Sequence, residues 1–170
     1  MDIDVLAVSQ AKEGNTESFE LVYAQAAPDL YKVALYTLGN THDAEDVVSE
    51  TFIEAYKGIK NLRDPASFRP WIMRILSIRC KRRIAQYIKD KNSIDIDEIL
   101  DLSADGEDSI QKAELLEALD SLRRDERMIV VLSVLQGYTT KEIAKILACP
   151  QGTVSSKLHR SLKKMRAMLA

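Results

Sequence analysis

Residues 151–170 carry side chains that can bind nucleic acid. This segment contains five lysines and arginines and no acidic residue. Lysine and arginine donate hydrogen bonds to phosphate oxygens and to guanine acceptors, while serine and histidine contact bases or backbone at shorter range. We expect DNA contacts from Ser155, Ser156, Lys157, His159, Arg160, Lys163 and Lys164.

A helix-turn-helix is the element that would position these side chains. Thr139 and Glu142 have the spacing of a capping box, which satisfies backbone N–H groups at a helix start. A short apolar helix follows, residues 148–152 indicate a turn, and a second helix then buries Val154. Ala144 is small where the two helices would cross, ten residues before Val154. This is the usual arrangement in which the second helix enters the major groove of DNA.

The beginnings of these two helices add further candidates. Thr140, Lys141 and Thr153 lie where backbone N–H groups point outward and can bind phosphate. The alternative is a helical hairpin whose basic face is only solvated. The capping box, the small crossing residue and the acid-free face together favour DNA binding.

Charge is segregated along the chain, although the net charge of −2 and the pI of about 5.8 conceal it. A second basic strip, residues 69–91, has eight lysines and arginines and one acid. Two acidic strips without a base balance them, with five acids in residues 43–54 and seven in residues 95–108. Each strip alone is explained equally well as a solvated helix face. Four strips of separated sign in one short chain favour several distinct binding surfaces.

Composition excludes several other classes of protein. No apolar run reaches 18 residues and no signal-peptide pattern begins the chain, so we expect a cytoplasmic protein without a membrane span. Cys80 and Cys149 match no metal or disulfide spacing, and we expect two reduced thiols. No nucleophile motif, phosphate loop or set of metal ligands is present. We therefore predict a protein that is not an enzyme and needs no cofactor or metal.

Helical periodicity predicts an all-α fold. The low counts of 6 glycines and 4 prolines in 170 residues also favour long helices. In the N-terminal half, we expect one helix capped by Asn15 or Thr16, a second that starts at Pro28 and ends at Gly39, and a third capped by Thr41. Residues 60–66 indicate a loop, and a further helix should run from Ser67 to about Ile88.

Residues 90–108 are acidic and lack clear periodicity, which predicts a flexible linker. One helix from Ser109 to Gly137 should then precede the helix-turn-helix. The fold expected is therefore two small helical domains, residues 1–89 and 109–170, the second ending in the helix-turn-helix. An extended linker of this length reaches roughly 60 Å. The tether lets the two domains bind separated DNA elements, and it equally lets them fold together and hide their surfaces.

Four stretches of sequence, which form two separate motifs, resemble bacterial sigma-70 family sigma factors, especially the extracytoplasmic-function (ECF) class. Residues 152–160, Gly-Thr-Val-Ser-Ser-Lys-Leu-His-Arg, resemble the signature of region 4, and residues 137–144 are similar to the first helix of that region. Residues 43–52 resemble the core of region 2, which docks on the polymerase clamp. Residues 68–75 resemble the start of the helix that recognises the −10 element. The two motifs occur in the right order and cover nearly the whole chain.

The resemblance implies partners and a role for each surface. It implies binding to the clamp and the flap of core RNA polymerase, to promoter DNA and to a cognate anti-sigma factor, with no membrane insertion of its own. The helix-turn-helix residues already named would bind the −35 element. Polymerase binding would involve Asp43, Glu45, Asp46, Val47 and Glu50. The −10 element would be bound by Lys60, Asn61, Leu62, Arg63, Arg69, Arg74, Ile78, Arg79, Lys81, Arg82 and Arg83.

Four positions depart from the family pattern. Ile78 stands where the family usually has asparagine, and Arg82 where it commonly has aspartate. Ser155 stands where a basic residue is frequent, and Ala148 where glycine is frequent. The first pair bears on promoter melting and the second on the −35 sequence.

Two alternatives stay open: a stand-alone helix-turn-helix regulator, and a degenerate sigma-like protein that binds polymerase or an anti-sigma factor without initiating. The acidic motif and basic helix of the first domain favour the sigma factor over the regulator.

Overall fold

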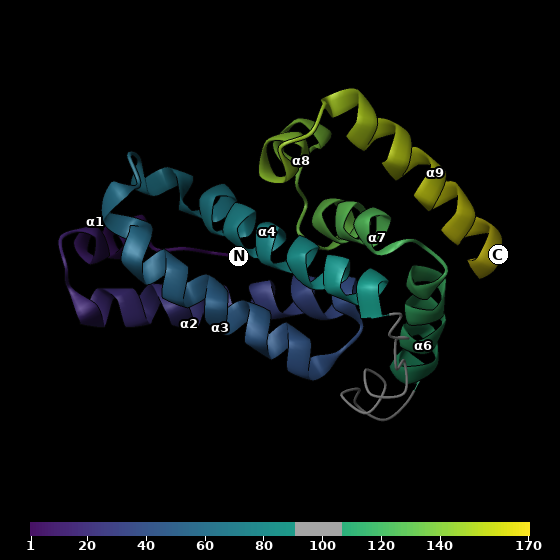
Figure 1. Cartoon of the computed structure of the whole chain (residues 1–170), viewed down its shortest axis with the longest axis horizontal. Coiled ribbons are helices and arrows are strands. Elements are labelled where there is room, and N and C mark those ends of the chain that lie inside the picture. The colour runs from purple at the N-terminus through teal and green to yellow at the C-terminus, as the bar shows by residue number, and fades with distance from the viewer. Residues whose placement is uncertain (91–106) are drawn as a thin grey trace.

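The computed structural model describes residues 1–90 and 107–170, and these ranges contain helices and turns but no strand (Figure 1). The all-α prediction is thus confirmed. Most of the predicted linker lies outside the described residues. Its two ends are helical, because α4 continues through Asp90 and α6 begins at Glu107. Within the described ranges, no helix combines the length and the apolar character needed to cross a membrane.

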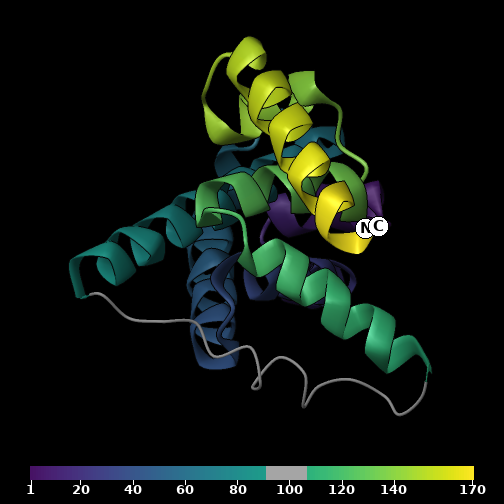
Figure 2. The same cartoon turned by 90° about the vertical axis from the view of Figure 1, so that its right-hand side faces the viewer.

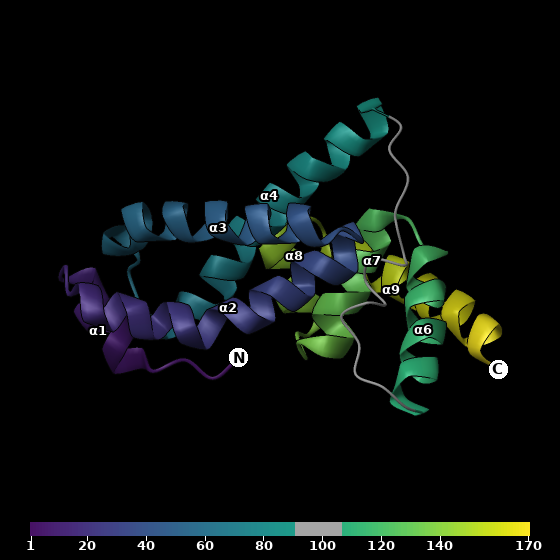
Figure 3. The same cartoon turned by 90° about the horizontal axis from the view of Figure 1, so that it is seen from below.

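Four helices and two short 3-10 turns form the N-terminal part. Its long helices run side by side or cross one another, as Figure 3 shows. The elements are α1 (Val5–Lys12), α2 (Thr16–Leu38), α3 (Thr41–Gly58), η1 (Ile59–Asn61), η2 (Pro65–Ser67) and α4 (Phe68–Asp90). The core between α2, α3 and α4 contains Leu30, Leu38, Phe68, Ile72 and Met73, each at most 1% exposed. Burial of these side chains is the main stabilising contribution to this part.

Helix α2 corrects the prediction that a helix begins at Pro28. It runs without a break from its cap at Asn15, and Pro28 lies exposed in its interior. Proline lacks the N–H that would bond one turn back, and it usually kinks or ends a helix. Here Val22 and Leu30 are fully buried on either side of the proline. Burial of this continuous apolar stripe outweighs the lost hydrogen bond.

The turn between α2 and α3 follows the prediction closely. Gly39 ends α2 with a left-handed φ of 74°, a conformation that favours glycine. The cap of α3 is one residue earlier than expected, because the Asn40 Oδ1 accepts a hydrogen bond of 2.9 Å from the Asp43 backbone N–H. Thr41 is therefore the first residue of the helix and not its cap.

The C-terminal part consists of α6 (Glu107–Asp120), α7 (Arg124–Val130), the π-helical turn η3 (Val131–Leu135), α8 (Thr140–Leu147) and α9 (Gln151–Leu169). A turn divides α6 from α7, so the single predicted helix up to Gly137 is wrong. Arg127, only 5% exposed, donates hydrogen bonds of 3.1 Å to the backbone carbonyls of Leu122 and Asp120 across this turn. Burial lowers the pKa of its guanidinium to about 10.

The two parts lie against each other. Helix α7 contacts α2, and α8 contacts α4, so that the helix-turn-helix sits on the basic helix (Figures 1 and 2). Of the two possibilities that the linker leaves open, this structure has the one in which the domains pack together. The contact determines which charged side chains are free to bind a partner.

Candidate nucleic-acid interface

The helix-turn-helix has the local geometry that the sequence predicts. Thr139 Oγ1 accepts a hydrogen bond of 3.2 Å from the Glu142 N–H, and Glu142 Oε2 accepts one of 2.7 Å from the Thr139 N–H. The bonds from Thr139 lower the pKa of Glu142. Ile143 and Val154 are fully buried where α8 and α9 meet. Ala148 is left-handed, with a φ of 52°, a conformation that favours glycine.

Most of the predicted −35 side chains lie free on the outer surface of the helix-turn-helix. The exposed set contains Lys141, Thr153, Ser155, Ser156, His159, Arg160 and Lys163. Thr140 is half-buried and accepts a hydrogen bond from Gln151. The structure thus presents a continuous face of donors on α9, the helix predicted to enter the major groove.

Two basic residues of α9 have internal partners. Lys157 Nζ lies 2.9 Å from Asp125 Oδ2 of α7, and Lys164 donates a hydrogen bond to the Ser121 carbonyl. Burial acts to raise the pKa of Asp125, but the hydrogen bond and charge of Lys157 and the charge of Arg123 outweigh it and lower the pKa. These two lysines hold α9 on the start of α7 and on the turn before it.

The basic helix α4 binds the C-terminal end of α8. Arg74 Nη1 donates to the Lys145 carbonyl at 2.9 Å, and Lys81 Nζ donates to the Leu147 carbonyl at 2.9 Å. Ser77 Oγ lies 3.4 Å from the Ile146 carbonyl between them. The last carbonyls of a helix lack partners within it and carry partial negative charge, so they favour such donors. Two residues predicted to bind the −10 element are therefore occupied inside the chain.

Aromatic contacts extend this interface along α4. The Arg69 guanidinium lies 5.5 Å from the centre of the Tyr138 ring, and the Arg124 guanidinium lies 4.6 Å from the centre of the Tyr87 ring. Burial raises the pKa values of both tyrosines. Each cation stacks on a ring from the other part of the chain, and such stacking contributes roughly 0.5–2 kcal/mol.

The acidic strip on α3 divides into two faces. Asp43 lies 2.7 Å from Arg83 and also binds the Tyr87 hydroxyl, both of α4. Arg79 likewise binds two acids of α3, with Nη2 2.6 Å from Glu54 and Nη1 3.6 Å from Glu50. Two of the four acids predicted to bind polymerase, Asp43 and Glu50, are therefore paired with predicted −10 residues, as is Glu54.

The second face of α3 points outward and combines acidic and apolar side chains. Glu45 and Asp46 are exposed and pair with no described cation, and Ile53, two turns beyond Asp46, is 57% exposed. Sequence analysis missed Ile53, although its spacing of seven residues from Asp46 places both on one helix face. The structure corrects the prediction for Val47, which is 1% exposed and packs in the core. Val47 cannot contact a partner directly.

The predicted −10 loop is built from the two 3-10 turns. Lys60, Asn61 and Arg63 are exposed. Leu62 is 7% exposed, which corrects the prediction that it contacts DNA. Its apolar side chain packs against the core and holds the loop in place. On α4, Ile78 is 39% exposed and Arg82 is exposed without a described partner.

An apolar groove lies between α6, the α7–η3 segment and α9, and sequence analysis did not assign it a role. Its volume is about 160 Å³, and Val134 at 60% and Leu135 at 44% exposure flank it. The other lining residues are Leu115, Leu119, Val130, Val131, Leu162, Met165, Arg166 and Leu169. The signal in the sequence was the apolar run from Ile129 to Leu132, followed closely by Val134 and Leu135. One buried helix face cannot accommodate so many neighbouring apolar side chains.

The described residues include no group that could hold a metal ion, and the Cys80 thiol is buried. No group of three or more histidine, cysteine, aspartate or glutamate residues comes together in these parts of the chain. Cys80 is buried, and burial raises its pKa to about 12, so the thiol stays protonated. Cys149 is half-buried and also free.

Comparisons with known proteins agree with this architecture. The model of "Sigma-70 region 2" matches residues 22–90 and that of "Sigma-70, region 4" matches residues 112–165. The chain is 34% identical to the ECF sigma factor SigE of Mycolicibacterium smegmatis, over 90% of this chain and 62% of that protein. It is 29% identical to SigW of Bacillus subtilis over 95% and 94% of the two chains. It is 30% identical to SigV of Bacillus subtilis over 83% and 84%.

Two solved structures share the fold. One is CnrH in complex with the cytosolic domain of CnrY, with a TM-score of 0.71, 24% identity and coverage of 99% and 97% of the chains. The other is the sigma factor RpoE of Bartonella quintana in complex with the anti-sigma factor NepR, with a TM-score of 0.73, 20% identity and coverage of 90% and 97%. At these identities the structures show similarity of fold alone.

Two helical parts, a capped helix-turn-helix and a basic helix before it are the architecture that the matched family models describe. The chain belongs to the sigma-70 family of bacterial RNA polymerase sigma factors, within the ECF class. Sigma factors are non-enzymatic transcription initiation factors that bind core RNA polymerase and promoter DNA.

Proposed function

We propose that this chain is an alternative sigma factor that binds core RNA polymerase and directs it to a subset of promoters. Residues 1–89 act as the region 2 domain, residues 90–108 as the linker and residues 109–170 as the region 4 domain. The observation that carries the proposal is the exposed, acid-free face of α9 on a capped helix-turn-helix, in the same chain as the basic helix α4.

In this proposal α9 binds the −35 element. Arg160 and Ser156 are exposed near the N-terminal half of the helix, where side chains reach base edges in the major groove. Lys141 and Thr153 lie at the starts of α8 and α9 and bind flanking phosphates. Five positive charges support only weak, salt-sensitive binding, so this face acts once polymerase holds the chain on the promoter.

The −10 element is bound by the loop of residues 60–66 and by α4. Arg74 and Lys81 are occupied by α8 carbonyls, and Arg79 and Arg83 by acids of α3. Binding of the −10 strand therefore requires α8 to leave α4. We infer that the closed arrangement is the resting form of the free chain and that polymerase and promoter stabilise an open form.

The outer face of α3 docks on the polymerase clamp. Glu45 and Asp46 supply charge for a basic partner surface, and Ile53 supplies an apolar anchor beside them. A charged rim around a buried apolar anchor is the usual composition of such an interface. Asp43 and Glu50 hold α4 in place and stabilise this face indirectly.

The apolar groove of the C-terminal part receives the flap of core polymerase. Val134 and Leu135 expose apolar surface beside a groove whose lining is otherwise almost entirely aliphatic. An amphipathic helix placed in such a groove buries its apolar face. This contact would hold the region 4 domain at the distance from the clamp that separates the two promoter elements.

An anti-sigma factor is a further partner in this proposal. The sigma factor RpoE of Bartonella quintana, which has the same fold, was solved in complex with the anti-sigma factor NepR. A partner that binds across α4 and α8 would stabilise the closed arrangement and keep Arg74 and Lys81 away from DNA.

Reconstitution tests the proposed function directly. Purified chain is mixed with core RNA polymerase and a library of promoter fragments, and run-off transcripts are sequenced. We expect transcripts from discrete start sites that share spaced −10 and −35 elements. Retention of polymerase without transcripts would indicate a degenerate sigma-like protein. Binding to palindromic DNA without polymerase retention would indicate a stand-alone regulator.

A further inference from the structure

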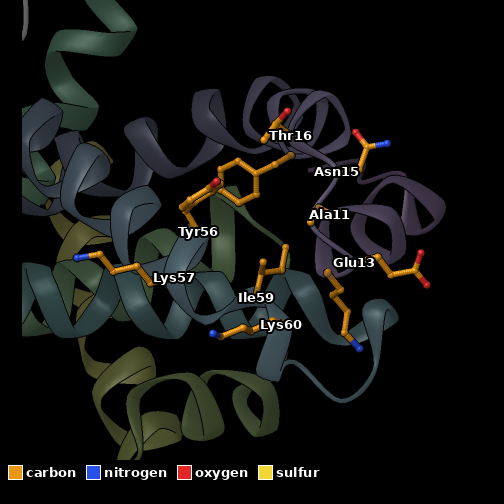
Figure 4. A pocket seen from close by; sticks show the side chains of 11 residues that line it. Ala11, Glu13, Asn15, Thr16, Tyr56, Lys57, Ile59 and Lys60 are labelled. Atoms are coloured by element: carbon orange, nitrogen blue, oxygen red, sulfur yellow. The ribbon is translucent and has the colours of Figure 1, made fainter.

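A polar cavity beside the basic helix α9 has no role in the assignments above. It lies between α9, the turn that joins α6 to α7 and the start of α7, and its volume is about 430 Å³. This is within the range of about 300–1,000 Å³ that is usual for small-ligand sites. It is distinct from the cavity of Figure 4, which lies between α1, α2 and α3 and borders the loop of residues 60–66 through Lys60.

Basic side chains outnumber acidic ones in the cavity beside α9. The basic residues that line it are Arg123, Lys157, Arg160 and Lys164. Of its two acids, Asp125 lies 2.9 Å from Lys157 and 3.5 Å from Arg123. Glu126 Oε2 accepts a hydrogen bond of 3.3 Å from the Arg123 backbone N–H. Both acids already have cationic or N–H partners, so the net positive charge of the cavity favours an anion.

A buried hydroxyl that lines the same cavity lacks a partner. Ser161 of α9 is 2% exposed, and its Oγ has no hydrogen-bond partner among the described residues. Buried polar groups are nearly always hydrogen-bonded, and a serine within a helix can bond the carbonyl one turn back. Ser161 does not use that carbonyl. An unpaired donor in a cavity of positive charge therefore indicates an anionic acceptor.

The donors of α9 form a row along the cavity. Arg160, Ser161 and Lys164 follow Lys157 by three, four and seven residues, which places all four on one helix face. From Lys157 to Lys164 this row extends about 10 Å along the helix axis. A single phosphate meets only part of such a row, whereas two or three linked phosphates meet all of it. None of the described residues that line the cavity is aromatic, so a base would have no ring to stack on.

We propose that this cavity binds a short chain of linked phosphate groups, either inorganic or part of a nucleotide. Lys157 leaves Asp125 and Lys164 leaves the Ser121 carbonyl to bind the chain, and the Ser161 hydroxyl donates to one of its oxygens. The bound chain also engages Arg160, so it excludes the −35 element from α9. This exclusion rests on the proposed function, whereas the site itself does not.

Isothermal titration calorimetry of the full chain tests the site, with inorganic tripolyphosphate, ATP and inorganic monophosphate as probes. We expect tripolyphosphate and ATP to bind with similar affinity and monophosphate to bind far more weakly. Ser161→Ala should weaken tripolyphosphate binding about tenfold, because it removes a hydroxyl that bonds a charged group. The substitution breaks no described hydrogen bond, so urea titration should show that the variant is as stable as the unaltered chain.

Two neighbouring lysines of α9 provide a matched pair of variants. Lys164→Gln should also weaken tripolyphosphate binding about tenfold, since it removes a charged donor from the cavity. Lys163 is exposed and does not line the cavity, so Lys163→Gln should change this affinity far less. Equal losses in both variants would show general attraction of an anion to a basic helix and overturn the site. Full affinity of Ser161→Ala, or binding of ATP without binding of tripolyphosphate, would overturn it too.

The exclusion of DNA is measured with the chain bound to core polymerase and a labelled promoter fragment that depends on its −35 element. We expect tripolyphosphate to release the fragment from the unaltered complex at concentrations that leave the Ser161→Ala complex bound. Equal release from both would assign the effect to polymerase or to chelation of Mg²⁺ and overturn the exclusion. Binding of polyglutamate with the same dependence on Ser161 would indicate a protein partner and overturn the phosphate assignment. Failure of the unaltered chain to retain polymerase counts against the proposed function, while calorimetry still decides the site.

Discussion

Arg74 of α4 donates a hydrogen bond of 2.9 Å to the carbonyl of Lys145 at the end of α8. This bond joins the helix predicted to bind the −10 element to the helix-turn-helix predicted to bind the −35 element. The bond from Lys81 to the Leu147 carbonyl does the same. Both bonds engage cationic side chains that could otherwise bind DNA phosphates. In the proposed function, the closed arrangement and promoter binding therefore compete for the same side chains.

Combined substitution Arg74→Ala and Lys81→Ala should open the free chain. The two bonds are partly exposed, so their loss should destabilise the closed arrangement by roughly 1–2 kcal/mol in total. Small-angle X-ray scattering should then give a larger radius of gyration. Arg82→Ala is the control, since Arg82 is exposed on the same helix without a described partner. Equal radii for the double variant and the control would contradict the role of these bonds.

Arg160→Ala should weaken promoter recognition. The guanidinium is exposed on α9, and the loss of one base contact costs about 1–3 kcal/mol. Run-off transcription from promoters with altered −35 sequences measures this change. Lys32→Ala, an exposed cation on α2, serves as the control. Unchanged promoter preference would remove Arg160 from the set of base-contacting residues.

Asp46→Lys should weaken binding to core polymerase and leave the fold intact. Asp46 is exposed on the outer face of α3 and makes no described ion pair, so charge reversal has no internal partner to disturb. A pull-down with core polymerase measures retention, and circular dichroism checks helix content. Glu20→Lys makes the same charge change at an exposed position of α2. Wild-type retention by the Asp46 variant would place the clamp interface elsewhere.

Val134→Asp should reduce transcription from promoters that depend on the −35 element. Val134 is 60% exposed beside the apolar groove, so a carboxylate there hinders an apolar partner without entering the core. Leu6→Asp, at 66% exposure on α1, adds the same charge far from the groove. If the two variants transcribe equally well, the groove does not receive the flap.

Stability at acid pH should depend on the pair Asp125 and Lys157. The pKa of Asp125 is lower in the folded chain than the value of about 3.9 for an unfolded one. The pair therefore stabilises the fold above about pH 4, and this contribution is lost as the pH falls through the folded pKa. Lys157→Gln should lower the free energy of unfolding at neutral pH by about 0.5 kcal/mol.

The same comparison at an acid pH below the lowered folded pKa of Asp125 should show a smaller difference, because the carboxyl is then protonated in both chains. Urea titration at the two pH values measures it. Lys163→Gln removes a charge from α9 that has no described ion pair, and it should show no such pH dependence. A constant deficit of the Lys157 variant at both pH values would contradict the assignment.

Local signals made the helix-turn-helix predictable from the sequence. The bond between Thr139 and Glu142 spans three residues, so its geometry follows from the helix alone. The contact of Arg74 with Lys145 spans 71 residues, and neither residue type indicates the other. Val47 shows a different limit, since helical periodicity places it on the apolar face of α3 and only the family resemblance put it among the polymerase-binding residues. The helix start predicted at Pro28 is wrong for a different reason. Burial of apolar side chains on both sides of the proline outweighed its tendency to end a helix.

The contact of α4 with α8 also has a consequence for measured affinities. A DNA strand that needs Arg74 and Lys81 can bind only the fraction of molecules in which α8 has left α4. The apparent dissociation constant of the isolated chain equals its intrinsic value divided by that fraction, so 1% of open molecules would weaken apparent binding about 100-fold. Variants that open the chain should therefore bind more tightly to ligands that contact other residues of the −10 surface. The affinity measured for the free chain is lower than the intrinsic affinity of that surface.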